Sequence, residues 1–360
     1  MKLTINAKDL TAALTDVKRY ASNKGAIPVL ACCKVVADGD AVTLTATDLE
    51  CAIILNLNAE VTESGTAVVP VASLAAAIKG CKGDLTLEHS GERLTVAGAT
   101  IPTDCKPESF PELPTFTGEY ADMPVKALQT LISRTIACVS SEVSRFTLNG
   151  SLFIGSDTGL KMVATDGHRL AMADEPGSFA PFRVLVPLFA LPELLRLKAS
   201  SVRFGADDNH LFFTTAGRTI IARKLTGNFP DYERVIPRDL KPNSLQIDRA
   251  VLLPVVERAV NLQKKERQPT LTFNLNGSVH ITTGGDTPLD QTLPGEYTGS
   301  EIAAGVNPVY LADWLKSAAA PRVELRFGEM KEDKGLWCVR DAIVLNSESG
   351  HQCIVMPLRP

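Results

Sequence analysis

The sequence repeats itself at an interval of about one third of its 360 residues. The segment Val42–Asp48 ends in Ala-Thr-Asp, and Leu160–Asp166 ends in the same three residues 118 positions later. A weaker third copy, Val279–Gly284, lies a further 118 positions along the chain. A repeat of this length limits the possible folds strongly, because each copy must form the same unit and bury its core in the same way.

Two further markers recur at nearly the same interval. Phe110-Pro111 and Phe229-Pro230 are 119 positions apart. The other marker is a valine followed five positions later by a leucine. Its copies are Val69-Pro70 with Leu74, Val186-Pro187 with Leu191, and Val306-Asn307 with Leu311. We infer triplication of one domain. Since proline-rich linkers lie near positions 119 and 241, we expect domains at 1–119, 120–241 and 242–360.

Each predicted domain has the same coarse pattern of helices and strands. Apolar residues spaced three and four apart predict a helix over Ala7–Ala21, and similar helices begin near Val125 and Arg249. A second, short helix is predicted in each repeat, at Ser73–Lys79, Ala190–Lys198 and Tyr310–Ser317. Segments of alternating polarity follow every helix, which predicts an α+β fold with antiparallel sheets. Long helices do not alternate with single strands, so a doubly wound parallel sheet is not expected.

Composition and charge exclude several classes of protein. No apolar stretch is long enough for a membrane helix, and the first residues lack the pattern of a signal peptide, so we expect a cytoplasmic protein. The eight cysteines form no Cys-x-x-Cys pair and are expected to be reduced and mostly buried. The formal charge of -4 excludes a uniformly basic surface but is compatible with one basic face.

The polar cluster most similar to an active site is Ala164–Leu170, which contains Asp166, His168 and Arg169. A hydrolase or transferase could use the carboxylate and imidazole as an acid and base pair, although a turn through Gly167 explains the same residues. Phosphate-binding, dinucleotide-binding, zinc-protease and serine-hydrolase motifs are all missing from the sequence, and nothing indicates a metal or an organic cofactor. A binding protein is therefore favoured over an enzyme.

Basic residues concentrate on or just after the predicted helices. For one helix alone, a solvated face is the usual explanation. Repeated domains present their helices on a common surface, which favours a shared basic face. The residues concerned are Lys8, Lys18, Arg19, Lys79, Lys82, Arg134, Arg196, Lys198, Arg258, Lys264, Lys265 and Lys316.

Four segments carry a specific family resemblance. Over its whole length the chain resembles the β subunit of bacterial DNA polymerase III, the family of sliding clamps. The matching segments are Glu142–Gly150, Ala164–Ala171, Asn228–Pro237 and Val355–Arg359. The resemblance implies three clamp domains per chain, with helices inside, antiparallel sheets outside, and two chains closing head to tail as a homodimeric ring around double-stranded DNA. It also implies a processivity factor rather than an enzyme.

The resemblance further implies sequence-independent contacts between basic side chains and DNA phosphates, which would allow a ring to slide. At Ala72, where some relatives are basic, this chain departs from the family pattern. The residues assigned to DNA are Lys24, Lys18, Arg19, Lys79, Lys82, Arg196 and Lys198.

Family members also bind short linear peptides in a groove between the second and third domains. The partners implied are the replicative polymerase alpha subunit, the clamp loader delta subunit, translesion polymerases, and mismatch repair and ligase proteins. The groove would be formed by Leu148, Thr165, Gly167, His168, Arg169, Leu170, Pro230, Arg234, Val235, Ile354, Met356, Pro357, Leu358 and Arg359. Its apolar walls suit Leu or Phe anchors, and arginines are expected at its rim. The terminal Pro360 differs from the aliphatic end of relatives and changes the expected outer edge of the groove.

The dimer interface implied by the resemblance joins the start of the third domain to the first domain of a second copy. Asn261 and Leu262 lie where relatives carry interface aliphatic residues. Because Asn261 is polar, we expect a weaker or differently packed dimer. A peptide-binding scaffold that never meets DNA remains an alternative to the clamp.

Overall fold

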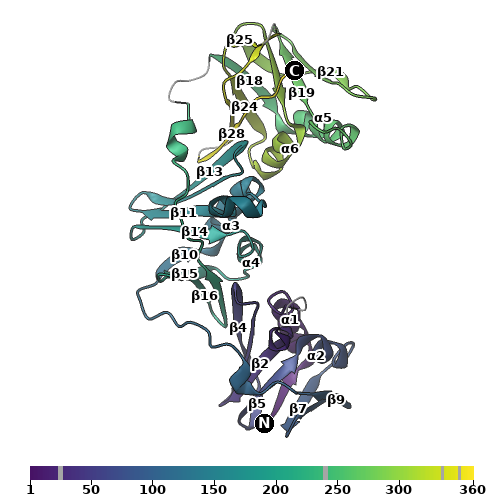
Figure 1. Cartoon of the computed structure of the whole chain (residues 1–360), viewed down its shortest axis with the longest axis vertical. Coiled ribbons are helices and arrows are strands. Elements are labelled where there is room, and N and C mark those ends of the chain that lie inside the picture. The colour runs from purple at the N-terminus through teal and green to yellow at the C-terminus, as the bar shows by residue number, and fades with distance from the viewer. Residues whose placement is uncertain (23–26, 238–241, 334–335, 348–349) are drawn as a thin grey trace. The chain divides into compact units, whose positions relative to one another are not determined.

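The computed structural model describes residues 1–22, 27–237, 242–333, 336–347 and 350–360 (Figure 1). The chain divides into two compact units, and each is described by itself. The first unit contains Met1–Val125 and Leu197–Lys224, and the second contains Lys126–Arg196 and Leu225–Pro360.

The first unit contains an eight-stranded antiparallel sheet in the order β10-β15-β16-β17-β4-β3-β2-β6. Its strands are β2 (Cys32–Asp38), β3 (Ala41–Thr47), β4 (Cys51–Asn58), β6 (Gly65–Pro70), β10 (Ala121–Pro124), β15 (Ser201–Ala206), β16 (His210–Thr215) and β17 (Arg218–Arg223). The pairing of β17 with β4 makes one continuous sheet from strands of the first and second repeats.

A five-stranded antiparallel sheet completes the first unit, in the order β5-β1-β7-β8-β9. Its strands are β1 (Lys2–Asn6), β5 (Glu60–Glu63), β7 (Asp84–Ser90), β8 (Arg93–Val96) and β9 (Ala99–Pro102). The helices of this unit are α1 (Ala7–Val17) and α2 (Val71–Ala77), with short 3-10 turns η1 (Pro28–Ala31) and η2 (Pro107–Ser109). Helix α1 begins where the Asn6 side chain accepts a hydrogen bond from the Lys8 amide, and it buries Leu10 and Leu14.

The second unit contains a nine-stranded antiparallel sheet in the order β14-β11-β12-β13-β28-β27-β24-β18-β22. Its strands are β11 (Gly150–Ser156), β12 (Gly159–Thr165), β13 (Arg169–Pro176), β14 (Phe182–Pro187), β18 (Asn243–Asp248), β22 (Glu296–Thr298), β24 (Arg322–Phe327), β27 (Ile343–Asn346) and β28 (His351–Val355). Here the pairing of β13 with β28 joins the second repeat to the third.

A four-stranded sheet in the order β21-β20-β19-β23 and a two-stranded sheet also lie in the second unit. Their strands are β19 (Leu271–Leu275), β20 (Val279–Thr283), β21 (Asp290–Leu293), β23 (Ile302–Val306), β25 (Met330–Asp333) and β26 (Leu336–Val339). The helices and 3-10 turns are α3 (Val125–Thr135), α4 (Leu191–Leu195), α5 (Arg249–Leu262), α6 (Pro308–Ser317), η3 (Ile136–Cys138), η4 (Val143–Leu148) and η5 (Tyr232–Val235). Figure 1 shows α5 beside α6, and the two helices pack together.

The α+β fold with antiparallel sheets, predicted from the alternating segments, is confirmed. The first helix is shorter than predicted, since it ends at Val17 rather than Ala21 and is followed by turns. The second helices of the first and third repeats begin two residues earlier than predicted, at Val71 and Pro308. The domain boundaries themselves stay a prediction.

The repeat is visible in hydrogen bonds as well as in sequence. The Asp48 carboxylate accepts hydrogen bonds from the amides of Glu50 and Cys51 at 3.1 and 2.7 Å. The Asp166 carboxylate accepts from the amides of His168 and Arg169 in the same way, at 2.9 and 3.0 Å. Equivalent turns therefore precede β4 and β13, the two strands through which neighbouring repeats share a sheet.

All eight cysteines lie within the described residues and are free. Six are buried, while Cys81 and Cys105 are partly exposed. Burial raises the pKa of Cys33 to about 12, which disfavours the reactive thiolate.

Candidate functional site

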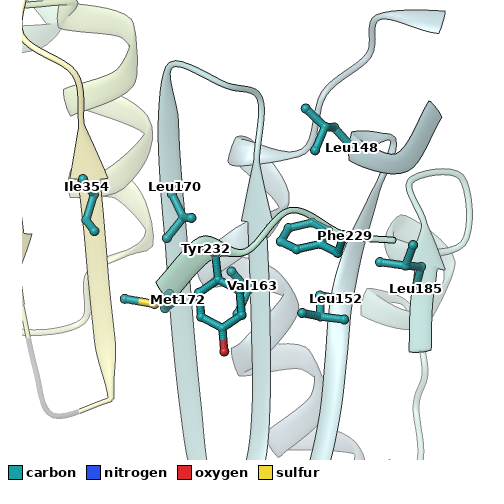
Figure 2. Packing of buried hydrophobic residues seen from close by; sticks show 9 residues of the cluster. All are labelled: Leu148, Leu152, Val163, Leu170, Met172, Leu185, Phe229, Tyr232 and Ile354. Carbon is teal, nitrogen blue, oxygen red and sulfur yellow. The ribbon is translucent and has the colours of Figure 1, made fainter. Parts of the chain in front are cut away.

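An apolar cluster on one face of the nine-stranded sheet is partly built from the chain segment around Phe229 and Tyr232 (Figure 2). This segment crosses the sheet and packs both rings onto the strand side chains that point to the same face. In Figure 2, Leu170 and Ile354 lie side by side on β13 and β28, where they are directly opposite in register. The cluster consists of Leu148, Leu152, Val163, Leu170, Met172, Leu185, Phe229, Tyr232 and Ile354.

An apolar hollow of about 200 Å³ opens beside this cluster. Its walls come from η4, the end of β12, the start of β13 and the turn between them, the crossing segment, and β28 with the residue after it. They are formed by Leu148, Thr165, Gly167, His168, Arg169, Leu170, Pro230, Asp231, Tyr232, Val235, Ile354 and Met356. We call this hollow the groove. Since Val235 is 52% and Met356 49% exposed, large apolar side chains stand open to a ligand here.

The structure brings ten of the fourteen predicted groove residues to the lining of the hollow. The other four lie outside it. Arg234 is 83% exposed and pairs with Asp231 at 2.8 Å, beside the wall. Leu358 donates its amide to the Gly305 carbonyl at 2.8 Å, while Pro357 is partly buried and Arg359 is exposed.

The backbone of the turn that forms one wall favours a glycine. Gly167 has φ +89°, and a Cβ at this position would lie 2.7 Å from Nη1 of Arg145. The Thr165 hydroxyl donates to the Arg169 carbonyl at 2.7 Å and accepts the Gly167 amide at 3.1 Å. Asp166 completes the turn by accepting two backbone amides, so its carboxylate serves the turn rather than the imidazole of His168.

The Arg169 side chain is buried rather than placed at a rim. Only 9% of it is exposed, and it donates to Asp166 at 3.0 Å and to Asp313 at 2.8 Å. Its guanidinium also donates to the Ala137 carbonyl at 2.5 Å and lies 4.3 Å from the centre of the Tyr310 ring. Burial alone would lower the pKa of Arg169, but Cys138 and the two carboxylates raise it above its ordinary value.

Three residues at the groove were missed in the sequence. Asp231 and Tyr232 line it directly. Arg145 donates to the Asp166 carbonyl at 3.0 Å and lies against Gly167. All three fall inside the segments that carry the family resemblance, and only this position in the sequence could have indicated them.

A larger and more polar hollow, of about 520 Å³, shares Tyr232 with the groove. Its charged walls are already partly neutralised, because Lys161 pairs with Asp174 at 3.2 Å and Glu175 pairs with Arg134 at 3.4 Å. The smaller apolar groove is therefore the better candidate for a binding site.

The basic residues assigned to DNA mostly follow the C-terminal ends of helices. Lys18 and Arg19 follow α1, while Lys79 and Lys82 follow α2. Cations are stabilised at such helix ends. Arg19 pairs with Asp16 at 2.7 Å, and after α4 Arg196 pairs with Glu193 at 2.8 Å while Lys198 is exposed. Lys24 lies outside the described residues.

The residues assigned to the dimer interface end helix α5. Asn261 is exposed, and Leu262 is 43% exposed. Within the described ranges, no group of three or more His, Cys, Asp or Glu side chains could hold a metal ion. Across the same ranges, the structure contains no helix with the length and apolarity needed to cross a membrane.

Two family matches cover the first and second repeats. Residues 1–115 match the DNA polymerase III beta subunit N-terminal domain, and residues 122–231 match its central domain. The beta sliding clamp of Caulobacter vibrioides is 27% identical over 387 aligned residues, covering 100% of both chains. The beta sliding clamp of Vibrio cholerae is 26% identical with the same coverage.

Solved structures give the same result. A sliding clamp from Pseudomonas aeruginosa bound to griselimycin has a TM-score of 0.91 at 26% identity and covers 100% of both chains. The DNA polymerase beta subunit of Streptococcus pyogenes has a TM-score of 0.92 over 100% of both chains; at 20% identity this likeness shows the fold alone.

Proposed function

Because the chain belongs to the DNA polymerase III beta subunit family, the beta sliding clamps, which are processivity factors and not enzymes, we propose that two copies encircle duplex DNA in the cytoplasm and tether replication proteins. Each chain would contribute three clamp domains, 1–119, 120–241 and 242–360. The observation that carries the proposal is the way neighbouring repeats share a sheet. Strand β17 pairs with β4, and β28 pairs with β13 at the equivalent register.

The first and third repeats each contain an equivalent strand that, among the described pairings, does not join two repeats. Strand β9 follows an Ala-Gly turn as β17 does, with Thr100 lying 119 positions before Thr219. Strand β21 pairs with β20 as β13 pairs with β12. Among the described strands, β9 and β21 stand at sheet edges. Pairing of β9 with β21 of a second copy would close a head-to-tail ring and cover both edges.

Within such a ring the basic helix ends would face DNA phosphates, and the contacts would be independent of sequence. A chain with a formal charge of -4 suits this task, because an acidic exterior discourages binding of DNA outside the ring. Retention would then depend on topology rather than on affinity.

The groove would hold the partners. Its apolar walls and exposed Val235 and Met356 suit a Leu or Phe anchor of a short peptide segment. We assign to it linear motifs of the replicative polymerase alpha subunit, the clamp loader delta subunit, translesion polymerases, and mismatch repair and ligase proteins.

The decisive experiment loads the protein onto nicked circular DNA with its clamp loader and then linearises the DNA. A clamp should slide off the new ends, so the bound fraction should fall to the level of unloaded protein. Loaded circles that are not cut serve as the control. If the protein stays bound after linearisation it is not a sliding ring, and if it never remains on circles the peptide-scaffold alternative is favoured.

A further inference from the structure

Arg169 lines the groove but has little capacity left to bind a ligand. Its Nε, Nη1 and Nη2 atoms already donate to Asp166, Asp313 and the Ala137 carbonyl. The Tyr310 ring covers one side of the guanidinium at 4.3 Å. A buried guanidinium with these partners acts on its neighbours rather than on a peptide.

The partners of Arg169 come from both repeats that build the groove. Asp166 and Ala137 belong to the second repeat, whereas Asp313 and Tyr310 lie on helix α6 of the third. The groove walls are composite in the same way: the turn before β13 comes from the second repeat, and β28 comes from the third. The guanidinium therefore connects the part of the groove that comes from the second repeat to the part that comes from the third.

We propose that Asp313 and Tyr310 are positioning residues of the groove, which hold Arg169 and, through it, the turn containing Gly167 and His168 at the spacing that accepts an apolar peptide anchor. This inference rests on the proposed peptide-binding function. Neither Asp313 nor Tyr310 lines the groove itself. Their effect on an anchor bound in this hollow would therefore be transmitted through the turn.

The loss of the Asp313 charge would change how the Arg169 guanidinium and the turn are held. Asp166 has to serve both the Arg169 side chain and the amides of His168 and Arg169. When Asp313 is neutralised, Asp166 is left as the one carboxylate bonded to the guanidinium among the described contacts. The guanidinium can then move toward Asp166, and the turn loses its ion pair to α6 and keeps only the contact with the Tyr310 ring. The chain should still fold, because the pairing of β13 with β28 is unaffected.

The test compares Asp313→Asn with wild type in the full-length protein. The probe is a fluorescein-labelled hexapeptide carrying Leu and Phe anchors, and its Kd is measured by fluorescence anisotropy. We expect Kd to rise about tenfold, the factor equivalent to 1.4 kcal/mol of binding free energy. Hydrogen exchange at the amides of His168 and Arg169 should become faster in the same variant.

Three further variants separate positioning from general loss of structure. Tyr310→Leu should weaken peptide binding, whereas Tyr310→Phe, which keeps the ring, should bind as wild type does. Glu257→Gln removes a 3.1 Å ion pair between Glu257 on α5 and Lys316 on α6, the helix that carries Asp313 and Tyr310, and should change neither measurement. If Asp313→Asn fails to fold, Tyr310→Leu is the deciding variant.

Unchanged Kd and unchanged exchange in Asp313→Asn and Tyr310→Leu would overturn the positioning role. If wild-type protein does not bind the peptide, the proposed groove function fails instead. In that case the exchange rates alone decide whether Asp313 holds the turn.

Discussion

At the scale of single residues, the equivalent turns before β4 and β13 differ at the position that has a left-handed backbone. Leu49 has φ 76° and Gly167 has φ +89°, so both occupy the left-handed region that favours glycine. Leu49 is 50% exposed and contributes little to the core. The left-handed backbone therefore strains a leucine in the first turn, whereas the second turn, at the groove, has no such strain.

We predict that Leu49→Gly stabilises the protein by about 0.5 to 1 kcal/mol, because relief of left-handed strain outweighs the greater chain entropy of glycine. Urea denaturation measures the change in free energy of unfolding. The reciprocal variant Gly167→Leu should be less stable than wild type, since a side chain there would meet Arg145. A less stable Leu49→Gly protein would contradict this explanation.

At the scale of the elements, a polar network ties three neighbouring strands of the nine-stranded sheet. Glu324 on β24 accepts hydrogen bonds from Ser244 on β18 at 2.9 Å and from Asn346 on β27 at 3.1 Å. It also pairs with Arg326 at 2.7 Å. Burial alone would raise the pKa of Glu324, but these donors lower it below its ordinary value.

A carboxylate whose pKa is lower in the folded than in the unfolded chain stabilises above the unfolded pKa, and this contribution disappears as the pH falls through the folded value. We therefore predict that Glu324→Gln lowers Tm at pH 7 and that the difference from wild type shrinks toward pH 3. Thermal unfolding followed by circular dichroism at several pH values measures this. Glu92→Gln, at an exposed turn, is the control. A difference that is independent of pH would mean that Glu324 acts through shape and not through charge.

At the scale of the whole molecule, the shared sheets predict the register of the proposed dimer. Thr219 lies opposite Ile54, and Gln352 lies opposite Met172. The equivalent positions at the free edges are Thr100 and Gln291. These two residues should therefore lie opposite each other across the interface of two copies.

The variant Thr100→Cys, Gln291→Cys should form a covalent dimer under mild oxidation, because opposite residues of antiparallel strands are about 4.5 to 5.5 Å apart between Cα atoms, which suits a disulfide. Non-reducing electrophoresis detects the product. Each single variant is a control for the native cysteines, two of which are partly exposed. Cross-linking no better than in the single variants would refute this register.

The sequence by itself determined the repeat, the antiparallel α+β class and the neighbourhood of the groove, since these depend on local periodicity and short motifs. Glycine at 167 is an example, because the turn chemistry of Thr165 and Asp166 is encoded within five residues. Only the tertiary structure decided which repeats share a sheet, because the pairing of β13 with β28 joins residues far apart in the chain. It also decided that Arg169 is buried against Asp313, 144 positions away, and not exposed at a rim. Charge and spacing identify an arginine as a candidate, but its partners depend on how the folded chain brings α6 to the turn.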